Sequence, residues 1–520
     1  MSALLRETEF GRWTTRLGFK LFPYAEDHPD FVPPARVPLD KACKKLQEDT
    51  TPTVVTDIER QAEAPELEGA TAVPSQATSI RQDVNIVGWY GDDDPDNPRN
   101  WSTFKKVVVL VQIGLFCFGV YGGSAIVVAS FDGLIEEFGV GHQETTLTVS
   151  LFVFAYGLGA LLFSPLSEIP YFGRNPWYVY VMMVFTALQV GAALTPTFAG
   201  LVVIRFLTGL LGSPILSTGG ASVADLFTAE ELPLKLSFYC APAFVAPAIT
   251  PVISAYAVQA KGWRWSMWEF LWIVGAIAVM IFFFLPETAK EIFLEAIVKP
   301  FEISLLDPSI AFAHVYIGLV YAIFYTFFDV FPIVYSGIYN LSFGAQGLMY
   351  LCIAAGCFVG LASYVIYYLT YLFPKIKRGF APSPEKRLEP SILAAVLAPA
   401  GLFIFAWSAR AEAHWIGSAF GAGLFVAANY VTFQCLFLYI IIAYDKYAAS
   451  LLAANDFLRS FVAAAIIHGG VPLFTNLGVG GGVSLLAALL AALGISGILV
   501  LHHFGAHLRA KSKFTVKQIA

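Results

Sequence analysis

Two apolar segments near the middle of the chain decide the fold. They read RFLTGLLGSPILSTGGASVADLF (residues 205–227) and KLSFYCAPAFVAPAITPVISAYAVQ (residues 235–259). An arginine inside a membrane span costs roughly 2.5–3.5 kcal/mol on insertion scales, so Arg205 is expected to face a cavity or a partner. Pro242, Pro247 and Pro251 would break a soluble helix, but neighbouring helices in a bundle can satisfy the carbonyls that they free. Small residues on both segments allow close approach of the backbones. We interpret the pair as two spans that line a polar path.

The composition excludes an ordinary soluble protein. Of 520 residues, 57% are hydrophobic and only 13% are charged, which indicates a polytopic membrane protein that has the bilayer around it and no nucleic-acid partner. The first long apolar run begins near Val107, and no signal peptide precedes it. The six cysteines lie singly, without a disulfide framework or a zinc-ligand spacing, so no metal is expected.

Apolar runs of about 20 residues predict an all-α membrane protein with twelve transmembrane helices. We place them near 106–129, 146–166, 176–195, 200–222, 236–258, 266–285, 311–336, 346–372, 391–408, 415–441, 449–473 and 482–504. With the N-terminus inside, the inner loops hold ten Lys and Arg residues and the outer loops hold three (Lys261, Arg264 and Arg410). This bias predicts that both termini are cytoplasmic.

The spans divide into two groups of six. We expect a largely disordered cytoplasmic tail over 1–104, six-helix bundles over 105–286 and 311–504, a linker over 287–310 and a C-tail over 505–520. A short interfacial helix over Phe10–Phe22 is the alternative to disorder in the first part of the tail. Two halves around a midplane site are the plan of a secondary transporter. The absence of a GxxxxGK[ST] loop argues against ATP as a direct energy source.

Several motifs resemble the major facilitator superfamily and, within it, the fungal twelve-span drug:proton antiporters. GWYGDDDPDNPRNWSTFKK (88–106) is similar to the entry sequence of fungal members, and SPLSEIPYFGRNP (164–176) is similar to the G-x-L-x-D-R-x-G-R loop. Four further stretches resemble this group: AVQAKGWRWSMW (257–268), FLPET (284–288), AANDFLRS (453–460) and FGAHLRAKSKF (504–514). The resemblance rests on the order of these motifs, which is kept across more than 400 residues.

Two departures from the family pattern are visible. The glycine-rich GPxxGP motif of the fifth span reads APAITP (246–251) here, so that the prolines remain and the glycines do not. This loosens the expected helix approach and weakens the inference of antiport. The 287–310 loop is also shorter than usual and lacks the basic run of the group.

Four ionisable residues are candidates for proton coupling. Asp329 lies among aromatics in FYTFFDVFPIVY (324–335), and an ionisable residue this deep in a span is functional by default. The resemblance implies an acidic residue there and a coupling role for Arg205, with a structural brace as the alternative. Asp456 and Arg459 stand three residues apart, so mutual neutralisation on one helix is the simpler interpretation. Asn455 is expected to line the cavity.

The resemblance also implies a cytoplasmic gate. In the family this loop locks the two halves, which places Glu168, Gly173 and Arg174 in the gate, with Asp225 as a partner. An ordinary solvated turn is the alternative. Asn340 heads a glycosylation sequon in a loop too short for modification, and His468 is expected to make a polar contact.

Aromatic side chains suit a cavity for planar apolar ligands. The candidates are Tyr239, Phe244, Tyr321, Tyr325 and Phe328. Simple packing remains the alternative for each one.

The sequence favours a monomeric plasma-membrane exporter of small amphipathic compounds in exchange for protons, with no cofactor and no enzymatic activity. The resemblance implies drugs, fungicides or toxic metabolites as substrates, and a vacuolar location is the alternative. A proton-coupled uptake permease for a nutrient such as a sugar is the second candidate. Against it, LFPKIKRGF (372–380) lacks the D-x-x-G-R-R loop of sugar porters. A transporter-like sensor is a third candidate, and its usual long C-tail is not expected here.

Overall fold

The computed structural model describes residues 8–17, 94, 97–167, 173–288, 303, 307–380, 382–444 and 448–511. The described residues are helical almost throughout and form no β-sheet. Most of the predicted tail over 1–104, the gate residue Glu168 and most of the 287–310 linker lie outside the described residues. The division into a tail, two bundles and a linker stays a prediction.

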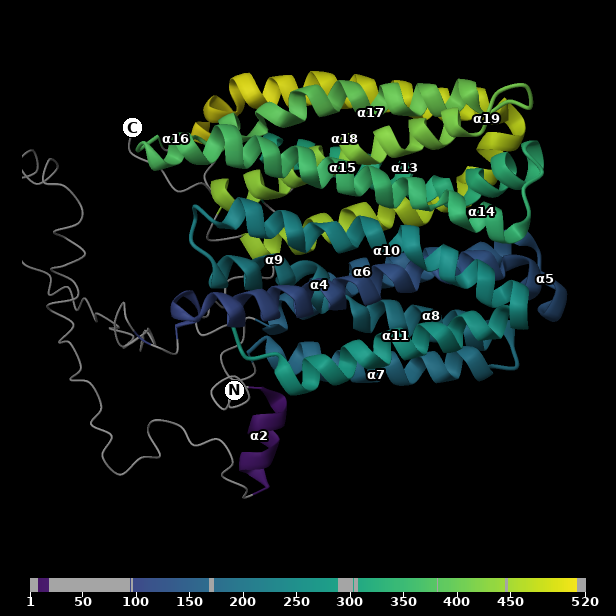
Figure 1. The fold of residues 1–520 in the computed structure, drawn as a ribbon, viewed down its shortest axis with the longest axis horizontal. Helices are drawn as coiled ribbons and strands as arrows, with labels where there is room; N and C mark the ends of the chain where they lie inside the picture. The colour runs from purple at the N-terminus through teal and green to yellow at the C-terminus, as the bar shows by residue number, and fades with distance from the viewer. Residues whose placement is uncertain are drawn as a thin grey trace, which may run out of the picture. The chain divides into compact units, whose positions relative to one another are not determined.

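The long helices follow the predicted spans (Figure 1). In chain order they are α4 (Thr103–Ala125), α6 (His142–Ser167), α7 (Asn175–Leu194), α8 (Phe198–Gly212), α9 (Pro214–Leu226), α10 (Leu232–Lys261), α11 (Trp263–Phe284), α13 (Pro308–Phe331), α15 (Leu351–Tyr367), α17 (Glu389–Ser408), α18 (Ile416–Ala443) and α19 (Ala448–Lys511). Short helices are α2 (Glu9–Arg16), α5 (Phe131–Phe138), α14 (Phe343–Met349) and α16 (Phe373–Lys377).

Secondary-structure breaks modify several predicted spans. The predicted fourth span divides into α8 and α9, with Pro214 at the first position of α9, where a missing N–H is tolerated. The seventh span continues past α13 as a π-helix, η5 (Pro332–Ile338). The eighth comprises α14, α15, a second π-helix, η6 (Tyr368–Leu372), and α16. In the described part of the chain, eleven helical stretches are long and apolar enough to cross a membrane.

The last of these stretches reverses direction. α19 has non-helical φ and ψ angles of 71° and 164° at Gly478, a backbone conformation that glycine tolerates best. Before this point, a Cβ on Gly318 would lie 3.7 Å from Cα of Arg459, and a Cβ on Gly470 would collide with Asp329. After it, Gly494 lies against Tyr316 and Gly497 against Phe312. Before Gly478, α19 runs along α13 toward higher α13 residue numbers. After Gly478, it runs back toward lower ones. This reversal supports two crossings. Twelve crossings and cytoplasmic termini stay predictions.

The three prolines of the fifth span lie within one continuous helix. α10 contains Pro242, Pro247 and Pro251, and side chains of other helices donate hydrogen bonds to its carbonyls. Tyr430 of α18 donates to the Ser237 carbonyl, and Gln434 donates to the Pro233 carbonyl at 3.2 Å. The prolines free the carbonyls of residues 238, 243 and 247 instead, so these contacts join α18 to α10, and the tolerance of proline through neighbouring helices stays a prediction.

The helices gather into two groups in Figure 1, one from α4 to α11 and one from α13 to α19. In the first group α6 packs against α8, and in the second α17 packs against α18 and α19. A Cβ on Gly209 of α8 would collide with the Phe152 carbonyl of α6. The small residues of the fourth span therefore do permit the close approach that we expected.

The described part of the N-terminal segment contains one short helix. Residues Glu9–Arg16 form α2, in which the Thr8 side chain accepts the Gly11 N–H at 3.2 Å as an N-cap. A largely disordered tail over 1–104 stays a prediction, and α2 is a short helix within it that packs on other helices. The helix is shorter than the alternative that we placed over Phe10–Phe22.

Candidate functional site: a buried arginine and tyrosine network

The centre of the site is an ion pair on α19. Arg459 Nη2 lies 2.5 Å from Asp456 Oδ1, and the two side chains are 3% and 0% exposed. Burial of a charge is costly unless the charge is paired, so this contact explains how both residues are tolerated inside the bundle. Arg459 also donates a hydrogen bond to the hydroxyl of Tyr121 on α4. The pair therefore contacts both helix groups.

Aromatic rings surround the Arg459 guanidinium. Its central carbon lies 5.0 Å from the ring centre of Tyr321 and 5.6 Å from that of Phe433, which are distances of cation–π contacts. A cavity of about 20 Å³ remains between these groups, with Phe244 and Asn429 in its wall. This space holds about one water molecule. The aromatic wall is thus closed around the arginine in this conformation.

Hydroxyl groups extend the network across α6 and α13. The hydroxyls of Tyr156 and Tyr321 are in hydrogen-bond contact, and each lies 3.3 Å from the hydroxyl of Tyr325. Tyr325 in turn lies 2.8 Å from Ser124 Oγ of α4. Three tyrosine hydroxyls and one serine hydroxyl therefore form a continuous polar cluster between the two helix groups.

Arg205 closes the other side of this cluster. It is completely buried on α8 and donates to the carbonyls of Thr148 (3.0 Å) and Ser124 (3.4 Å). Its guanidinium carbon lies 4.3 Å from the ring centre of Phe152. Nη1 has no hydrogen-bond partner, and no carboxylate of the described residues lies within ion-pair distance. The geometry is that of the brace between helices, the alternative that the sequence left open.

Asp329 occupies a separate cavity. It lies two residues before the end of α13, is 7% exposed, and its Oδ2 has no hydrogen-bond partner. The cavity has a volume of about 360 Å³ and is lined by both helix groups, including Asp132, Pro251, Phe328 and Tyr350. The Tyr350 hydroxyl is also buried without a partner. The coupling role of Asp329 and its place at the midplane stay predictions.

The predicted gate residues meet at the opposite end of the bundle. Arg174 Nη1 lies 2.5 Å from Asp225 Oδ2 and 3.4 Å from Ser222 Oγ. Burial disfavours the charge of Arg174, but Asp225, Tyr178 and Glu287 outweigh this effect and raise its pKa. Gly173 has a φ of 70°, and a Cβ there would collide with Glu287. We call this end, which carries Arg174, Asp225 and Glu287, the inner end.

The inner end is held together by contacts between the two helix groups. Tyr368 donates to the Glu230 carbonyl, and the bonds from Tyr430 and Gln434 to α10 lie in the same region. The larger of the two cavities between the helix groups, with Asp329, lies toward the other end. At that end His468 has polar partners, since its Nε2 lies 2.9 Å from Ser150 Oγ. In this conformation, hydrogen bonds join the two helix groups at the inner end. At the opposite end, which we call the outer end, a cavity lies between them.

The remaining predicted residues are dispersed. Tyr239 donates to the Ile215 carbonyl at 2.8 Å, and Phe244 packs edge-on against Tyr430 and Phe433. Asn455 is buried beside Asp456, and both of its side-chain polar atoms lack a partner. Phe328 lines the Asp329 cavity. The structure thus places Tyr321, Phe244 and Arg459 around one cavity and Phe328 and Asp329 around another.

Sequence reasoning missed three residues of the central network and one at the inner end. Tyr121 accepts from Arg459, Ser124 and Tyr156 belong to the hydroxyl cluster, and Glu287 binds the start of α7. In the sequence, Tyr121, Ser124 and Tyr156 stand out only as polar residues within successive spans. That pattern does not distinguish a cluster from separate packing contacts. The described residues contain no group of His, Cys, Asp and Glu suited to a metal ion.

Comparison with known proteins identifies the family. Residues 113–467 match the family model described as Major Facilitator Superfamily. The chain is 38% identical to the MFS-type transporter pyvG of Aspergillus violaceofuscus, over 97% of each chain. It is 34% identical to fluconazole resistance protein 1 of Saccharomyces cerevisiae, over 86% of this chain and 88% of that protein. It is 32% identical to the cycloheximide resistance protein of Candida maltosa, over 99% and 100%.

Solved structures show the same fold at low sequence identity. The human organic anion transporter MFSD10 aligns with a TM-score of 0.58 at 16% identity, over 76% of this chain and 99% of that chain. The proton:xylose symporter XylE aligns with a TM-score of 0.58 at 13% identity, over 78% and 96%. Such identities speak only for the fold. Together with the family match and the relatives that cover nearly the whole chain, they establish that this protein is a multi-pass membrane transporter of the major facilitator superfamily.

Proposed function

We propose that the protein exports small amphipathic compounds in exchange for protons by alternating access. The relatives named for resistance to fluconazole and cycloheximide support export. The aromatic walls around Arg459 and in the Asp329 cavity suit planar apolar ligands that carry a polar group. We also propose that the protein is a monomer in the plasma membrane, crosses it twelve times with both termini in the cytoplasm, and needs no cofactor.

The observation that carries the proposal is the Asp329 carboxylate. One of its oxygens is buried without a partner in a cavity that both helix groups line. A carboxylate in such a place is costly as an anion and therefore binds a proton or a cationic group readily. Because both groups line the cavity, loss or gain of that proton can bias their relative position.

The test is an efflux assay in yeast that lacks its own drug exporters. Cells are loaded with a fluorescent cationic dye, and retention is followed with and without a protonophore, with surface expression measured in parallel. We expect the wild type to lower retention, the protonophore to abolish this, and Asp329→Asn to retain dye like cells without the transporter.

Asp132→Asn is the matched control, because Asp132 lies at the wall of the same cavity but is exposed. It is expected to retain efflux. Higher dye retention in the wild type than in empty cells would instead establish uptake. Undiminished efflux in Asp329→Asn would show that Asp329 is not the proton site, and Asp456 and Arg459 would be the next candidates.

A further inference from the structure

The N-terminal helix α2 is attached to the bundle by a specific face. Helices as short as its eight residues are marginal in isolation, so packing must hold α2 in place. The Phe10 ring lies 4.9 Å from that of Phe283 and 6.3 Å from that of Phe282 on α11. The Trp13 indole N–H donates to the Tyr180 hydroxyl of α7 at 2.9 Å. α2 therefore bridges the inner ends of α7 and α11.

A buried carboxylate fixes the register of α2 on this surface. Glu9 is 1% exposed, accepts a hydrogen bond from the Tyr180 hydroxyl at 3.0 Å and pairs with Arg12 of the next turn at 3.1 Å. A charge this deep is stable only with its partners in place, so sliding or rotation of α2 would be costly. The attachment is thus a defined contact rather than a general apolar one.

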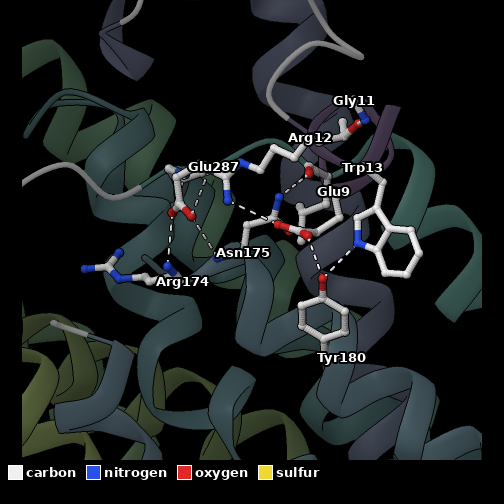
Figure 2. A network of polar contacts seen from close by, with 11 residues as sticks. Glu9, Gly11, Arg12, Trp13, Arg174, Asn175, Tyr180 and Glu287 are labelled. Carbon is white, nitrogen blue, oxygen red and sulfur yellow. Dashed lines mark hydrogen bonds and ion pairs between the residues drawn. The ribbon is translucent and has the colours of Figure 1, made fainter. Parts of the chain in front are cut away.

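Arg12 connects α2 to the gate through Glu287, as Figure 2 shows. Its second amino group lies 3.7 Å from one Glu287 oxygen. The Glu287 carboxylate accepts the backbone N–H groups of Arg174 and Asn175, each at 3.1 Å. These N–H groups stand at the start of α7 and have no acceptor within the helix, and a carboxylate is favourable there. The contacts run without a break from α2 to the residue that pairs with Asp225.

We propose that α2 is a clamp that positions the inner gate. While α2 is docked, Arg12 holds Glu287 on the start of α7, and the Arg174 side chain stays directed at Asp225. Release of α2 loosens Glu287 and favours opening of the inner end. Glu9, Arg12 and Glu287 are positioning residues in this device, and they do not touch substrate. The transport consequence rests on the proposed alternating access, whereas the positioning itself does not.

Hydrogen exchange of the purified full chain in nanodiscs tests the clamp directly. In Arg12→Ala, we expect peptides covering 173–178 to exchange about two- to fivefold faster, the effect of losing a partly exposed ion pair. Exchange at the far end of α7, over 188–194, should not change. Arg16→Ala is the matched control, since Arg16 lies on the same helix and has no partner among the described residues. It should match the wild type throughout.

Three results would overturn the proposal: unchanged exchange at 173–178 in Arg12→Ala, an equal rise along all of α7, or the same rise in Arg16→Ala. The second would show that α2 only stabilises the fold. Deletion of residues 1–17 should exceed the effect of Arg12→Ala at 173–178.

Transport kinetics give the independent functional readout. At saturating dye, the efflux rate per surface molecule should change at least twofold in Arg12→Ala and remain at the wild-type value in Arg16→Ala. If both variants transport like the wild type, the clamp has no role in gating. If the wild type itself moves no dye, the proposed function fails, while the exchange result still decides whether α2 positions the gate.

Discussion

Arg205 and Arg459 are both buried in the centre of the bundle, yet they are held in different ways. Arg459 has a carboxylate partner on its own helix at 2.5 Å. Arg205 has two backbone carbonyls and the face of Phe152. A fixed pair is nearly neutral, and protonation of Asp456 would leave the pair positively charged. Arg205 keeps an uncompensated charge whatever happens at Asp456. The comparison separates a buried charge with a counterion from a buried charge without one.

The largest effect is expected at the pair. Asp456→Asn leaves the buried Arg459 charge without a counterion, and breaking a buried pair in this way costs about 3–5 kcal/mol. We expect little protein at the cell surface and a markedly lower unfolding midpoint in detergent, followed by tryptophan fluorescence. The double variant Asp456→Leu with Arg459→Met removes both charges and should recover most of the stability but no transport. A single variant as stable as the wild type would contradict the pair as described.

A smaller effect is expected at the brace. Arg205→Met removes the charge and its two hydrogen bonds to carbonyls, and bonds to charged groups contribute about 1.5–3 kcal/mol. Thermal unfolding measures the loss. Arg205→Lys keeps the charge but loses the planar fork that reaches two carbonyls, so we expect intermediate stability. Full stability of the lysine variant would mean that charge alone matters and that the two-carbonyl geometry does not.

The smallest effect is expected in the hydroxyl cluster that lies between the two arginines. Tyr325→Phe keeps the ring and removes its contacts with Ser124, Tyr156 and Tyr321, which should cost about 1 kcal/mol. Tyr316→Phe on the same helix is the control, because Tyr316 is buried without a hydrogen bond to the described residues. Equal unfolding midpoints for the two variants would show that the hydroxyl cluster does not stabilise the region between Arg205 and Arg459.

The helical architecture was largely predictable because a membrane span has a simple signature. Length and hydropathy located every long helix, including the two parts of α19. The sequence did not reveal that α8 ends before Pro214 or that π-helices extend two spans. Such changes depend on local hydrogen bonds and packing, which hydropathy does not report.

The candidate site was less predictable because its contacts join residues far apart in sequence. The pairing of Asp456 with Arg459 follows from helical spacing. The contact of Arg174 with Asp225 was anticipated only through the family resemblance. The cluster of Tyr156, Tyr321 and Tyr325 depends on helix rotation, which a single sequence does not fix. The docking of α2 depends on Glu9 and Tyr180, 171 positions apart.

The reversal of α19 at Gly478 has a consequence for biosynthesis. α13 carries Asp329 and Tyr325, but part of the surface that covers it is supplied by Gly494 and Gly497, near the end of the chain. At a synthesis rate of about 5–20 residues per second, the ribosome needs roughly 10–30 s to proceed from Asp329 to these glycines. During that interval Phe312 and Tyr316 must rest against lipid or an insertion factor. Assembly of the site is therefore among the last events in the production of this transporter.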